Sequence, residues 1–267
     1  MQPEARQQRI EEHLQQAEFA SLEELSELVD ASVSTVRRDV QTLEARGVVR
    51  RTHGGARLLN PRSDEFVFAA RDTHELDEKE AIGRACAELV RPNQSLILDA
   101  GTTVFHVAKQ LGPRAPQIIT NSLPVANLFA SNPRVEVLLS GGVIYPRIGV
   151  LVGPLAVEAF SKMHADVAIM SSGGITLDGI TNSHGLLIDI QRAMIAAAQR
   201  VIFCLDHSKI DRRSVSYLCP LDDVDTIVTD HLAPPGLVGQ LRDRGLEVVL
   251  AEPLERRGNG GSHEARG

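Results

Sequence analysis

Hydrophobic residues recur at helical spacing in three short segments near the start of the chain. Segments 4–17 and 21–30 are both amphipathic, and the second opens with Ser21 and Glu24 in the S-x-x-E spacing of a capping box. The third segment, 32–46, repeats an apolar residue every three or four positions: Val33, Val36, Val40 and Leu43. Three helices packed around a small core are therefore predicted, the third beginning at Ser32 and ending before Gly47.

The pattern changes from helical to extended after the third segment. Residues 48–52 are expected to form a strand, residues 53–55 a turn and residues 56–58 a returning strand. Two helices, a tight turn, a third helix and a basic hairpin follow the order of a winged helix-turn-helix. We therefore predict a DNA-binding domain at residues 1–59.

Charge supports this prediction. Residues 37–57 carry six arginines and two acids, a net charge of +4, whereas residues 1–36 carry two arginines and eight acids, a net charge of −6. A compact arginine face on an acidic domain is typical of a protein that reads duplex DNA. A solvated helix with incidental arginines would explain the charge alone; the order of the elements favours DNA.

Candidate DNA contacts come from the geometry of such domains. The first exposed residues of the third helix meet base edges in the major groove, and the wing reaches phosphates or the minor groove. The predicted contacts are Ser32, Ser34, Thr35, Arg37, Arg38 and Gln41 on the helix, and Arg50, Arg51 and His53 on the wing.

From Lys79 onward, short apolar runs alternate with amphipathic segments. The predicted strands are 95–99, 117–120, 135–140, 166–171, 201–206, 226–229 and 247–250, and the predicted helices are 81–90, 103–111, 123–130, 154–163, 187–199 and 234–244. This alternation indicates an α/β domain at residues 79–251, with a mostly parallel sheet covered on both faces. Residues 60–78 are expected to be a linker, and the polar, glycine-rich residues 252–267 a disordered tail.

Polar and glycine residues gather where five of the predicted strands end, at 99–103, 120–122, 140–142, 171–174 and 206–209. Each cluster alone is more often a simple turn. Successive strand ends of a parallel sheet meet at one edge, however, where ligands of such sheets bind. Hydroxyls, helix N–H groups and the ammonium of Lys209 could hold an anion there, although Lys209 could instead form a structural pair with Asp206.

The run VSTVRRDVQTLEARGVVRRTHGGA resembles the signature of the DeoR family of bacterial transcriptional regulators, in which an Arg-Arg-Asp recognition helix precedes an Arg-x-His-Gly-Gly-Ala wing. The five clusters resemble the sensor domain of that family, which is similar in fold to ribose-phosphate isomerases and CoA transferases. The resemblance implies a pocket for a phosphorylated sugar or sugar metabolite, lined by Asp99, Gly101, Thr102, Thr103, Thr120, Asn121, Gly142, Asp206 and Lys209. Many relatives carry a Glu and a Lys where this chain has Leu187 and Gln191, so the effector of a particular relative is not transferred.

The predicted function is sequence-specific regulation of transcription. By the family resemblance we expect a repressor of carbohydrate-metabolism genes that is relieved by the sugar metabolite. A dimer or tetramer on double-stranded operator DNA is expected, because one winged helix makes few base contacts. No cofactor and no catalysis are expected.

Two alternatives remain open. A sugar-phosphate isomerase with an appended DNA-binding domain would need a carboxylate base; Asp99, Asp178, Asp189 and Asp206 are available, without an evident pair. A metal-responsive regulator would use some of the nine histidines, but these lack the spacing of a ligand motif.

Composition sets the remaining limits. A chain of 267 residues with 43% hydrophobic and 24% charged residues fits two globular domains, and a net charge of −7 argues against coating nucleic acid over the whole surface. No apolar run approaches the roughly 18–20 residues of a membrane span, and the start lacks a signal-peptide core, so a cytoplasmic protein without membrane contact is predicted. Cys86, Cys204 and Cys219 are scattered and are interpreted as core thiols.

Overall fold

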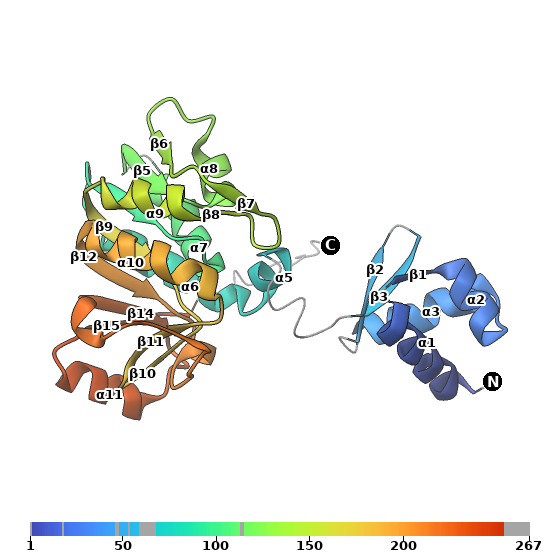
Figure 1. Ribbon diagram of the computed structural model, residues 1–267. Helices are drawn as coiled ribbons and strands as arrows, with labels where there is room; N and C mark the ends of the chain where they lie inside the picture. The colour runs from blue at the N-terminus through green and yellow to red at the C-terminus, as the bar shows by residue number, and fades with distance from the viewer. Residues whose placement is uncertain are drawn as a thin grey trace, which may run out of the picture. The chain divides into compact units, whose positions relative to one another are not determined.

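The computed structural model describes residues 2–17, 19–45, 48–52, 54–58, 68–112 and 115–253. The chain divides into two compact units, Met1–Ala70 and Arg71–Gly267 (Figure 1). Some of the expectations above fall wholly or partly outside the described residues. They are the Gly47 helix end, His53 of the wing, the first part of the 60–78 linker and the tail beyond residue 253.

The N-terminal unit is the predicted winged helix-turn-helix. Its helices are α1 (Pro3–Ala17), α2 (Leu22–Val29) and α3 (Val33–Ala45), and its strands are β1 (Phe19–Ser21), β2 (Val49–Thr52) and β3 (Gly55–Leu58). The strands form an antiparallel sheet in the order β1-β3-β2. Strand β1 was not predicted, because three residues are too few to show an alternating pattern.

The ends of the helices follow from single side chains. The Ser21 hydroxyl accepts a hydrogen bond from the backbone N–H of Glu24, and the Glu24 carboxylate accepts one from the N–H of Ser21, which completes the predicted capping box. Asp30 ends α2 in the left-handed region at φ 47°. The Ser32 hydroxyl then accepts from the N–H of Thr35 at 3.3 Å, and α3 begins.

The C-terminal unit is built on a seven-stranded sheet in the order β15-β14-β12-β9-β4-β5-β6. All neighbouring strands in it are parallel. The strands are β4 (Ser95–Leu98), β5 (Gln117–Thr120), β6 (Glu136–Leu139), β9 (Ala165–Met170), β12 (Ala198–Cys204), β14 (Thr226–Asp230) and β15 (Glu247–Ala251). The chain builds outward from β4 to β6, then returns to the other side of β4 and builds outward again. The reversal between β4 and β9 makes a topological switch point.

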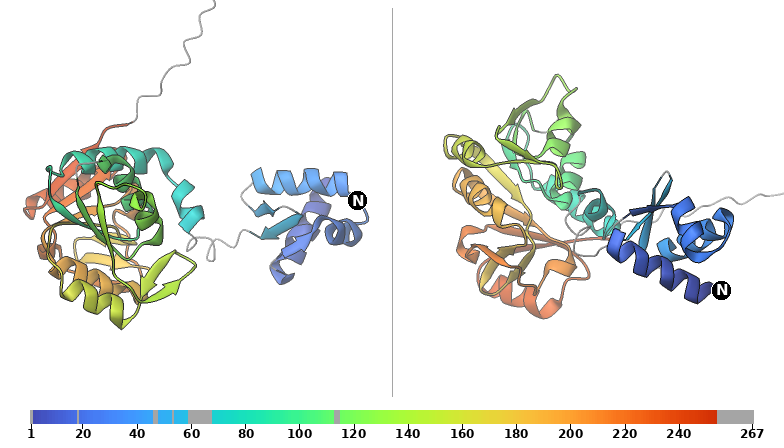
Figure 2. Two further views of the ribbon diagram at one scale, coloured as in Figure 1. Left: turned by 90° about the horizontal axis from the view of Figure 1, so that it is seen from above. Right: turned by 45° about the vertical axis from the view of Figure 1, so that its right-hand side comes forward.

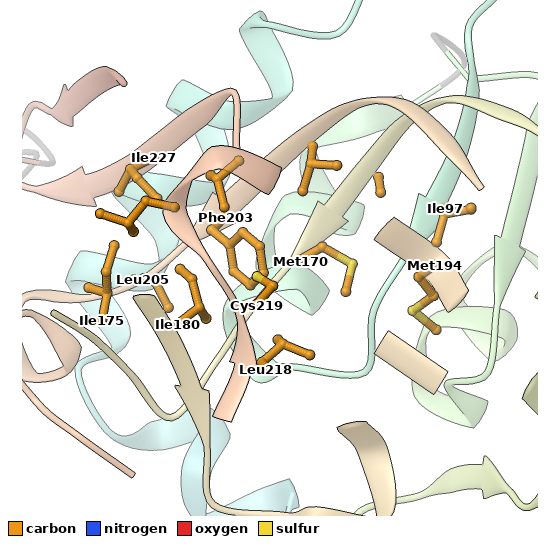
Figure 3. Packing of buried hydrophobic residues seen from close by; sticks show 14 of the residues in the cluster. Ile97, Met170, Ile175, Ile180, Met194, Phe203, Leu205, Leu218, Cys219 and Ile227 are labelled. Atoms are coloured by element: carbon orange, nitrogen blue, oxygen red, sulfur yellow. The ribbon is translucent and has the colours of Figure 1, made fainter. Parts of the chain in front are cut away.

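Helices cover both faces of this sheet (Figures 1 and 2). On one face lie α6 (Leu76–Glu88), α7 (Thr102–Leu111) and α8 (Leu123–Phe129), and on the other α9 (Pro154–Ser161), α10 (Ile188–Ala196) and α11 (Pro235–Asp243). Successive strand residues alternate between the two cores: Leu96 and Leu98 pack with the first helices, and Ile97 with the second. Figure 3 shows part of the second core, with Phe203 between Met170, Leu205 and Cys219.

Several short elements of this unit were missed by sequence reasoning. They are the antiparallel sheet β10-β11-β13 (Gly174–Thr176, Gly179–Asn182 and Ser216–Cys219) and the hairpin of β7 (Val143–Tyr145) and β8 (Val150–Val152). Their glycines obscure the pattern but are needed: a Cβ on Gly174 would lie 2.1 Å from the Arg212 carbonyl oxygen. The predicted helix 187–199 was also too long, because residues from Ala198 onward pair with β9 as part of β12.

The predicted linker at 60–78 needs a correction. Its second half is helical, since α5 (Phe68–Thr73) precedes α6, which begins at Leu76. This segment is held by side chains of the C-terminal unit: the Lys79 ammonium donates to the carbonyls of Arg71 and His74. Polar composition alone does not reveal such anchoring, and the C-terminal unit therefore begins before Lys79.

Candidate nucleic-acid interface and effector site

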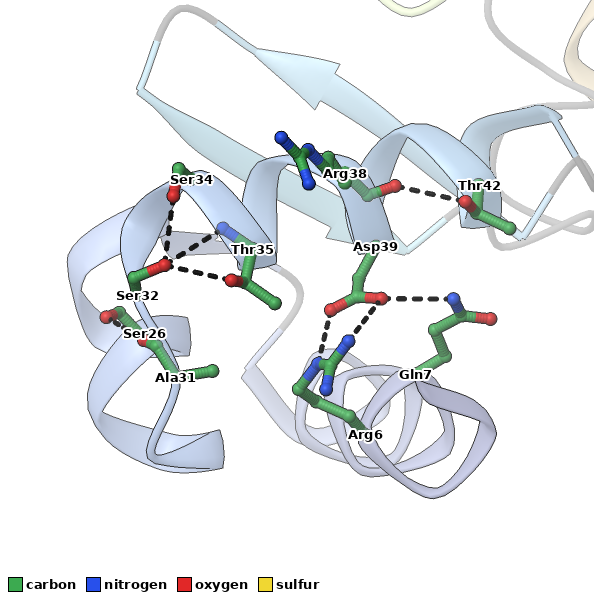
Figure 4. A network of polar contacts seen from close by, with 10 residues as sticks. All are labelled: Arg6, Gln7, Ser26, Ala31, Ser32, Ser34, Thr35, Arg38, Asp39 and Thr42. Carbon is green, nitrogen blue, oxygen red and sulfur yellow. Dashed lines mark hydrogen bonds and ion pairs between the residues drawn. The ribbon is translucent and has the colours of Figure 1, made fainter. Parts of the chain in front are cut away.

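The outward face of α3 carries most of the predicted DNA contacts. Ser34, Arg37, Arg38 and Gln41 are exposed, whereas Val36, Val40 and Leu43 on the opposite face are buried. Thr35 is half-buried. The Ser32 hydroxyl lies 2.9 Å from those of both Ser34 and Thr35, so it belongs to the polar cap of the helix (Figure 4).

Asp39 fixes the orientation of this face and was missed by sequence reasoning. Asp39 is buried, and its carboxylate accepts hydrogen bonds from the Arg6 guanidinium at 2.5 and 3.1 Å and from the Gln7 amide at 3.1 Å (Figure 4). Asp39 thus ties α3 to α1 and does not neutralise Arg37 or Arg38. Its spacing from Val36, Val40 and Leu43 already placed it on the inner face, which was the available signal.

The wing contributes cations that differ in their surroundings. The Arg51 guanidinium and backbone N–H both donate to Glu44 of α3, at 2.5 and 3.0 Å, and the backbone bond is the largest cause of the lowered pKa of Glu44. Within the part of the chain that the structure describes, Arg37, Arg38 and Arg50 form no ion pair with a carboxylate, although the charge of Arg50 also helps to lower the pKa of Glu44. Arg51 is therefore partly committed to holding the wing, and His53 lies outside the described residues.

The five polar clusters of the C-terminal unit follow β4, β5, β6, β9 and β12, which are neighbours in the sheet. They therefore occupy one edge, as expected of parallel strands. With about 4.8 Å between strands, the ends of β6 and β12 are roughly 19 Å apart. Gly142 and Asp206 thus lie at opposite ends of this edge, and one sugar phosphate would not span the nine predicted residues.

A buried polar network occupies the switch point at the centre of the edge. The Asp99 carboxylate accepts hydrogen bonds from the Ser171 backbone N–H at 3.1 Å, the Ser171 hydroxyl at 3.3 Å and the Gln191 amide at 3.0 Å. The Gln191 side-chain oxygen in turn accepts from Asn182 at 2.7 Å. Gln191, noted from the sequence only as a departure from relatives, is therefore a structural partner of Asp99, and Asn182 is in turn a partner of Gln191.

Burial raises the pKa of Asp99, although N–H groups of Ala100 and Ser171 and the amide of Gln191 oppose the shift. Gly101 is essential to this packing, because a Cβ there would lie 1.7 Å from the Ser171 hydroxyl oxygen. Asp99 and Gly101 thus hold the ends of β4 and β9 together.

Donors and acceptors for a ligand lie beside this network. Thr102 and Thr103 are buried at the start of α7, where Gly101 provides no side-chain cap. The Asn121 amide nitrogen donates to the Leu151 carbonyl at 3.1 Å, while its buried side-chain oxygen has no partner among the described residues. The Thr120 hydroxyl, by contrast, is engaged with the Leu98 carbonyl and the Ser122 N–H.

Charged groups gather at the end of β12. Asp206 caps the short 3-10 helix η3 (His207–Lys209) by accepting from the Ser208 N–H and hydroxyl. Burial would raise the pKa of Asp206, but Lys209, Ser208 and Lys79 outweigh it and the pKa is lowered. Lys209 thus lies within electrostatic reach of Asp206.

Lys79 is a further charged group here that sequence reasoning missed. Its side chain is buried, and burial lowers its pKa to about 8 against the opposing attraction of Asp206. Since Lys79 stands three and four positions before the buried Ile82 and Gly83, helical spacing could have placed it on the inner face of α6.

The described residues hold no group of three His, Cys, Asp or Glu side chains that could bind a metal ion, nor a helix long and apolar enough to cross a membrane. Cys86, Cys204 and Cys219 are buried free thiols.

A winged helix-turn-helix with an arginine face, joined to an α/β unit, defines a two-domain DNA-binding transcription regulator. The chain belongs to the DeoR family of such regulators: residues 6–62 match the model of the DeoR-like helix-turn-helix domain, and residues 74–231 match that of the DeoR C terminal sensor domain.

Curated relatives agree over nearly the full length. The chain is 33% identical to the HTH-type transcriptional regulator GolR of Listeria innocua, covering 94% of this chain and 99% of the relative. It is 32% identical to the HTH-type transcriptional repressor CsqR of Escherichia coli, covering 88% and 90%, and 32% identical to the HTH-type transcriptional repressor GlcR of Bacillus subtilis, covering 92% and 95%.

Among solved structures, the chain is similar to ribose 5-phosphate isomerase A from Neisseria gonorrhoeae, with a TM-score of 0.35, 17% identity and coverage of 51% of this chain and 53% of that one. It is also similar to eIF2B delta from Chaetomium thermophilum, with a TM-score of 0.38, 14% identity and coverage of 72% and 69%.

Proposed function

We propose that this protein is a transcriptional repressor of carbohydrate-metabolism genes whose C-terminal unit binds a phosphorylated sugar metabolite. The observation that carries the DNA-binding part is the division of α3 into a buried face fixed by Asp39 and an exposed face of Ser34, Arg37, Arg38 and Gln41. Repression is supported by relatives that are named repressors.

On DNA, α3 enters the major groove and its guanidinium groups read base edges. Arg37 and Arg38 are exposed, and each makes a bidentate contact with guanine. The other helix contacts lie beside them: Ser32, Ser34, Thr35 and Gln41. On the wing, Arg50 and His53 contact the phosphates. Arg51 contacts them from its position beside Glu44. These wing contacts add affinity without sequence preference.

In the C-terminal unit, the effector binds at the switch point between β4 and β9 and reaches toward the end of β12. The unpartnered acceptor of Asn121 takes a sugar hydroxyl, and Thr102 and Thr103 with the N–H groups at the start of α7 complete the polar wall. Lys209 supplies the positive charge for the phosphate. Asp99, Gly101, Thr120 and Asp206 shape the site through their internal hydrogen bonds. Gly142 lies at the other end of the same edge, beyond the reach of one sugar phosphate held at Lys209.

Control of DNA binding follows from differential affinity. A metabolite that binds one arrangement of the DNA-binding domains more tightly than another shifts the population toward it. A dimer or tetramer provides those arrangements, because paired winged helices must match the spacing of paired half-sites.

Thermal melting of the full-length protein against a panel of sugar phosphates and the corresponding free sugars tests the effector assignment. A ligand at about 100 times its dissociation constant stabilises the bound domain by about 2.7 kcal/mol, which is visible as a rise in Tm. A rise with a phosphorylated compound, absent for its free sugar and lost in Lys209→Ala, is the expected result. Equal rises in Lys209→Ala and wild type would remove Lys209 from the site, and a flat panel would contradict sugar-phosphate binding.

A further inference from the structure

The turn at the end of β12 contains a histidine that is held by a buried acid of the next strand. Asp230, the last residue of β14, is 0% exposed. Its carboxylate accepts from the His207 backbone N–H at 2.6 Å and from the Leu232 N–H at 2.9 Å, and it lies 3.1 Å from the His207 ring nitrogen Nδ1. Backbone and ring of His207 are thus both fixed by one carboxylate.

This arrangement sets the direction of the ring. A carboxylate is an acceptor, so Nδ1 carries a proton that lies between the two residues, and Nε2 is the ring nitrogen left for a ligand. Because Asp230 is fully enclosed while the His207 side chain is 27% exposed, the opposite edge of the ring, which carries Nε2, faces outward. In the described part of the chain, Nε2 has no hydrogen-bond partner and is not enclosed. An oriented imidazole edge is therefore open to a ligand.

The surroundings favour an anion at this end of the edge. Lys209 belongs to the same turn, and the Lys79 ammonium lies close enough to Asp206 to affect its pKa. The switch-point network of Asp99, Ser171, Gln191 and Asn182, by contrast, contains amides and hydroxyls and no cation. Hydroxyl groups of a ligand fit the network, and its negatively charged group fits the end of β12.

We propose that His207, positioned by Asp230, is an effector-contacting residue whose imidazolium form, with both ring nitrogens protonated, donates a hydrogen bond from Nε2 to the phosphate group of the ligand. This assignment deepens the proposed function and rests on it. It also fixes the direction of the ligand, with phosphate toward β12 and sugar hydroxyls toward the switch point at β9 and β4.

The test uses two replacements that separate the two ring nitrogens. The amide nitrogen of an asparagine can occupy the place of Nδ1, so His207→Asn keeps a donor toward Asp230 and removes Nε2. A glutamine amide reaches the place of Nε2, so His207→Gln keeps the ligand-facing group and gives up the contact with Asp230. Asp230 itself stays unchanged, because it also binds two backbone N–H groups.

The full-length protein and both variants are titrated with inorganic phosphate at constant ionic strength, and the histidine Cε1–H signals are followed by NMR. We expect a saturable shift of the His207 signal, identified by its loss in the variants, and no shift of His13 in the DNA-binding unit. Loss of a charge-assisted hydrogen bond should weaken phosphate binding about ten-fold in His207→Asn. His207→Gln should lose less phosphate affinity, because its amide keeps the ligand-facing group.

The outcomes separate this proposal from the one on which it rests. A His207 signal that does not shift when phosphate is added would overturn the role of Nε2. Equal losses of phosphate affinity in the two variants, accompanied by a lower Tm, would also overturn it. A Lys209-dependent melting response to sugar phosphates would in that case leave the proposed effector site standing. If phosphate produces no saturable shift and the sugar-phosphate panel is flat, both proposals fail.

Discussion

At the scale of single residues, the DNA-binding unit assigns different tasks to side chains that look alike in the sequence. Arg37 and Arg38 extend from α3 without a carboxylate partner among the described residues, whereas Arg51 is bonded to Glu44. Asp39, adjacent to these arginines in sequence, points inward to Arg6 and Gln7. Helical spacing could have assigned Asp39 to the inner face, but its partners lie more than thirty residues away and leave no local signal.

Replacing the outward arginines should therefore affect DNA recognition without affecting folding. Arg37→Ala or Arg38→Ala should lower operator affinity by about 1–3 kcal/mol and relax base preference, because each removes a two-pronged contact. Fluorescence anisotropy with duplexes selected from a random library measures both effects. Arg134→Ala, an exposed arginine of the C-terminal unit, is the matched control. Wild-type affinity in both α3 variants would refute the assignment of the recognition face.

Replacing Asp39, whose side chain points inward, should instead affect the stability of the N-terminal unit. Asp39→Ala leaves the donors of Arg6 and Gln7 unsatisfied, so the melting transition of the N-terminal unit should fall by several degrees. Differential scanning calorimetry at several protein concentrations measures this melting transition. Asp30→Ala is unsuitable for comparison because Asp30 adopts a left-handed backbone; exposed Glu23→Ala on α2 is the better control. An unchanged transition in Asp39→Ala would mean that this ion pair does not secure α3.

At the scale of elements, the parallel strands and their covering helices were predictable and the short antiparallel strands were not. Each strand of the parallel sheet contains an apolar run, as expected of a strand buried on both faces. Strands β7, β8, β10, β11 and β13 are three or four residues long, β10 and β11 contain glycine, and β13 pairs with β11 from more than thirty residues away. Local pattern cannot identify such partners. The candidate site was predictable to the same degree. Its strand ends were predicted, but Gln191 and Lys79, which lie on helices, and Asn182, which lies in the small antiparallel sheet, were not predicted as parts of it.

Gly101 offers a test of how tightly two elements must meet. Gly101→Ala places a methyl group 1.7 Å from the Ser171 hydroxyl oxygen, so β4 and β9 must separate at the switch point. Overpacking of this kind should cost about 1–3 kcal/mol and weaken effector binding. Chemical denaturation gives the stability change. Gly236→Ala on α11, where a Cβ meets nothing within 4 Å, should be neutral or stabilising. Equal stability of the two variants would contradict the packing described here.

Lys79 links α6 to α5 and should leave a signature in the pH dependence of stability. Its pKa is about 8 in the folded chain against 10.5 in the unfolded chain, mainly because of burial. Between these values the unfolded state binds more protons, so stability rises with pH; below about 8 the full penalty applies. The shift corresponds to about 3 kcal/mol.

Urea unfolding at intervals from pH 7 to 10.5 makes this visible as a difference between variants. Wild type should gain stability relative to Lys79→Met across that range, since methionine keeps the buried stem and cannot titrate. Lys162→Met, at an exposed lysine of α9, controls for the general loss of a lysine. A difference in the free energy of unfolding between wild type and Lys79→Met that stays constant with pH would show that burial does not destabilise the charged form of Lys79.

At the scale of the whole molecule, two units with separate cores carry the predicted DNA contacts and the predicted effector site. The N-terminal core is small and carries the arginine face, and the larger unit carries the polar edge of the sheet. Family membership and the order of both units were predictable, because their motifs are contiguous in sequence. Effector identity was not, because ligand chemistry depends on side chains brought together from separate strands.

The most direct measurement is the dissociation constant of the full-length protein for its operator while the phosphorylated sugar identified by thermal melting is added. We predict that operator affinity falls about 5–150-fold at saturating metabolite, the range of ordinary allosteric coupling. Lys209→Ala should bind operator normally and show no response. Operator affinity that stays constant in the presence of a metabolite bound at Lys209 would contradict the account, since sensing and DNA recognition would then be uncoupled.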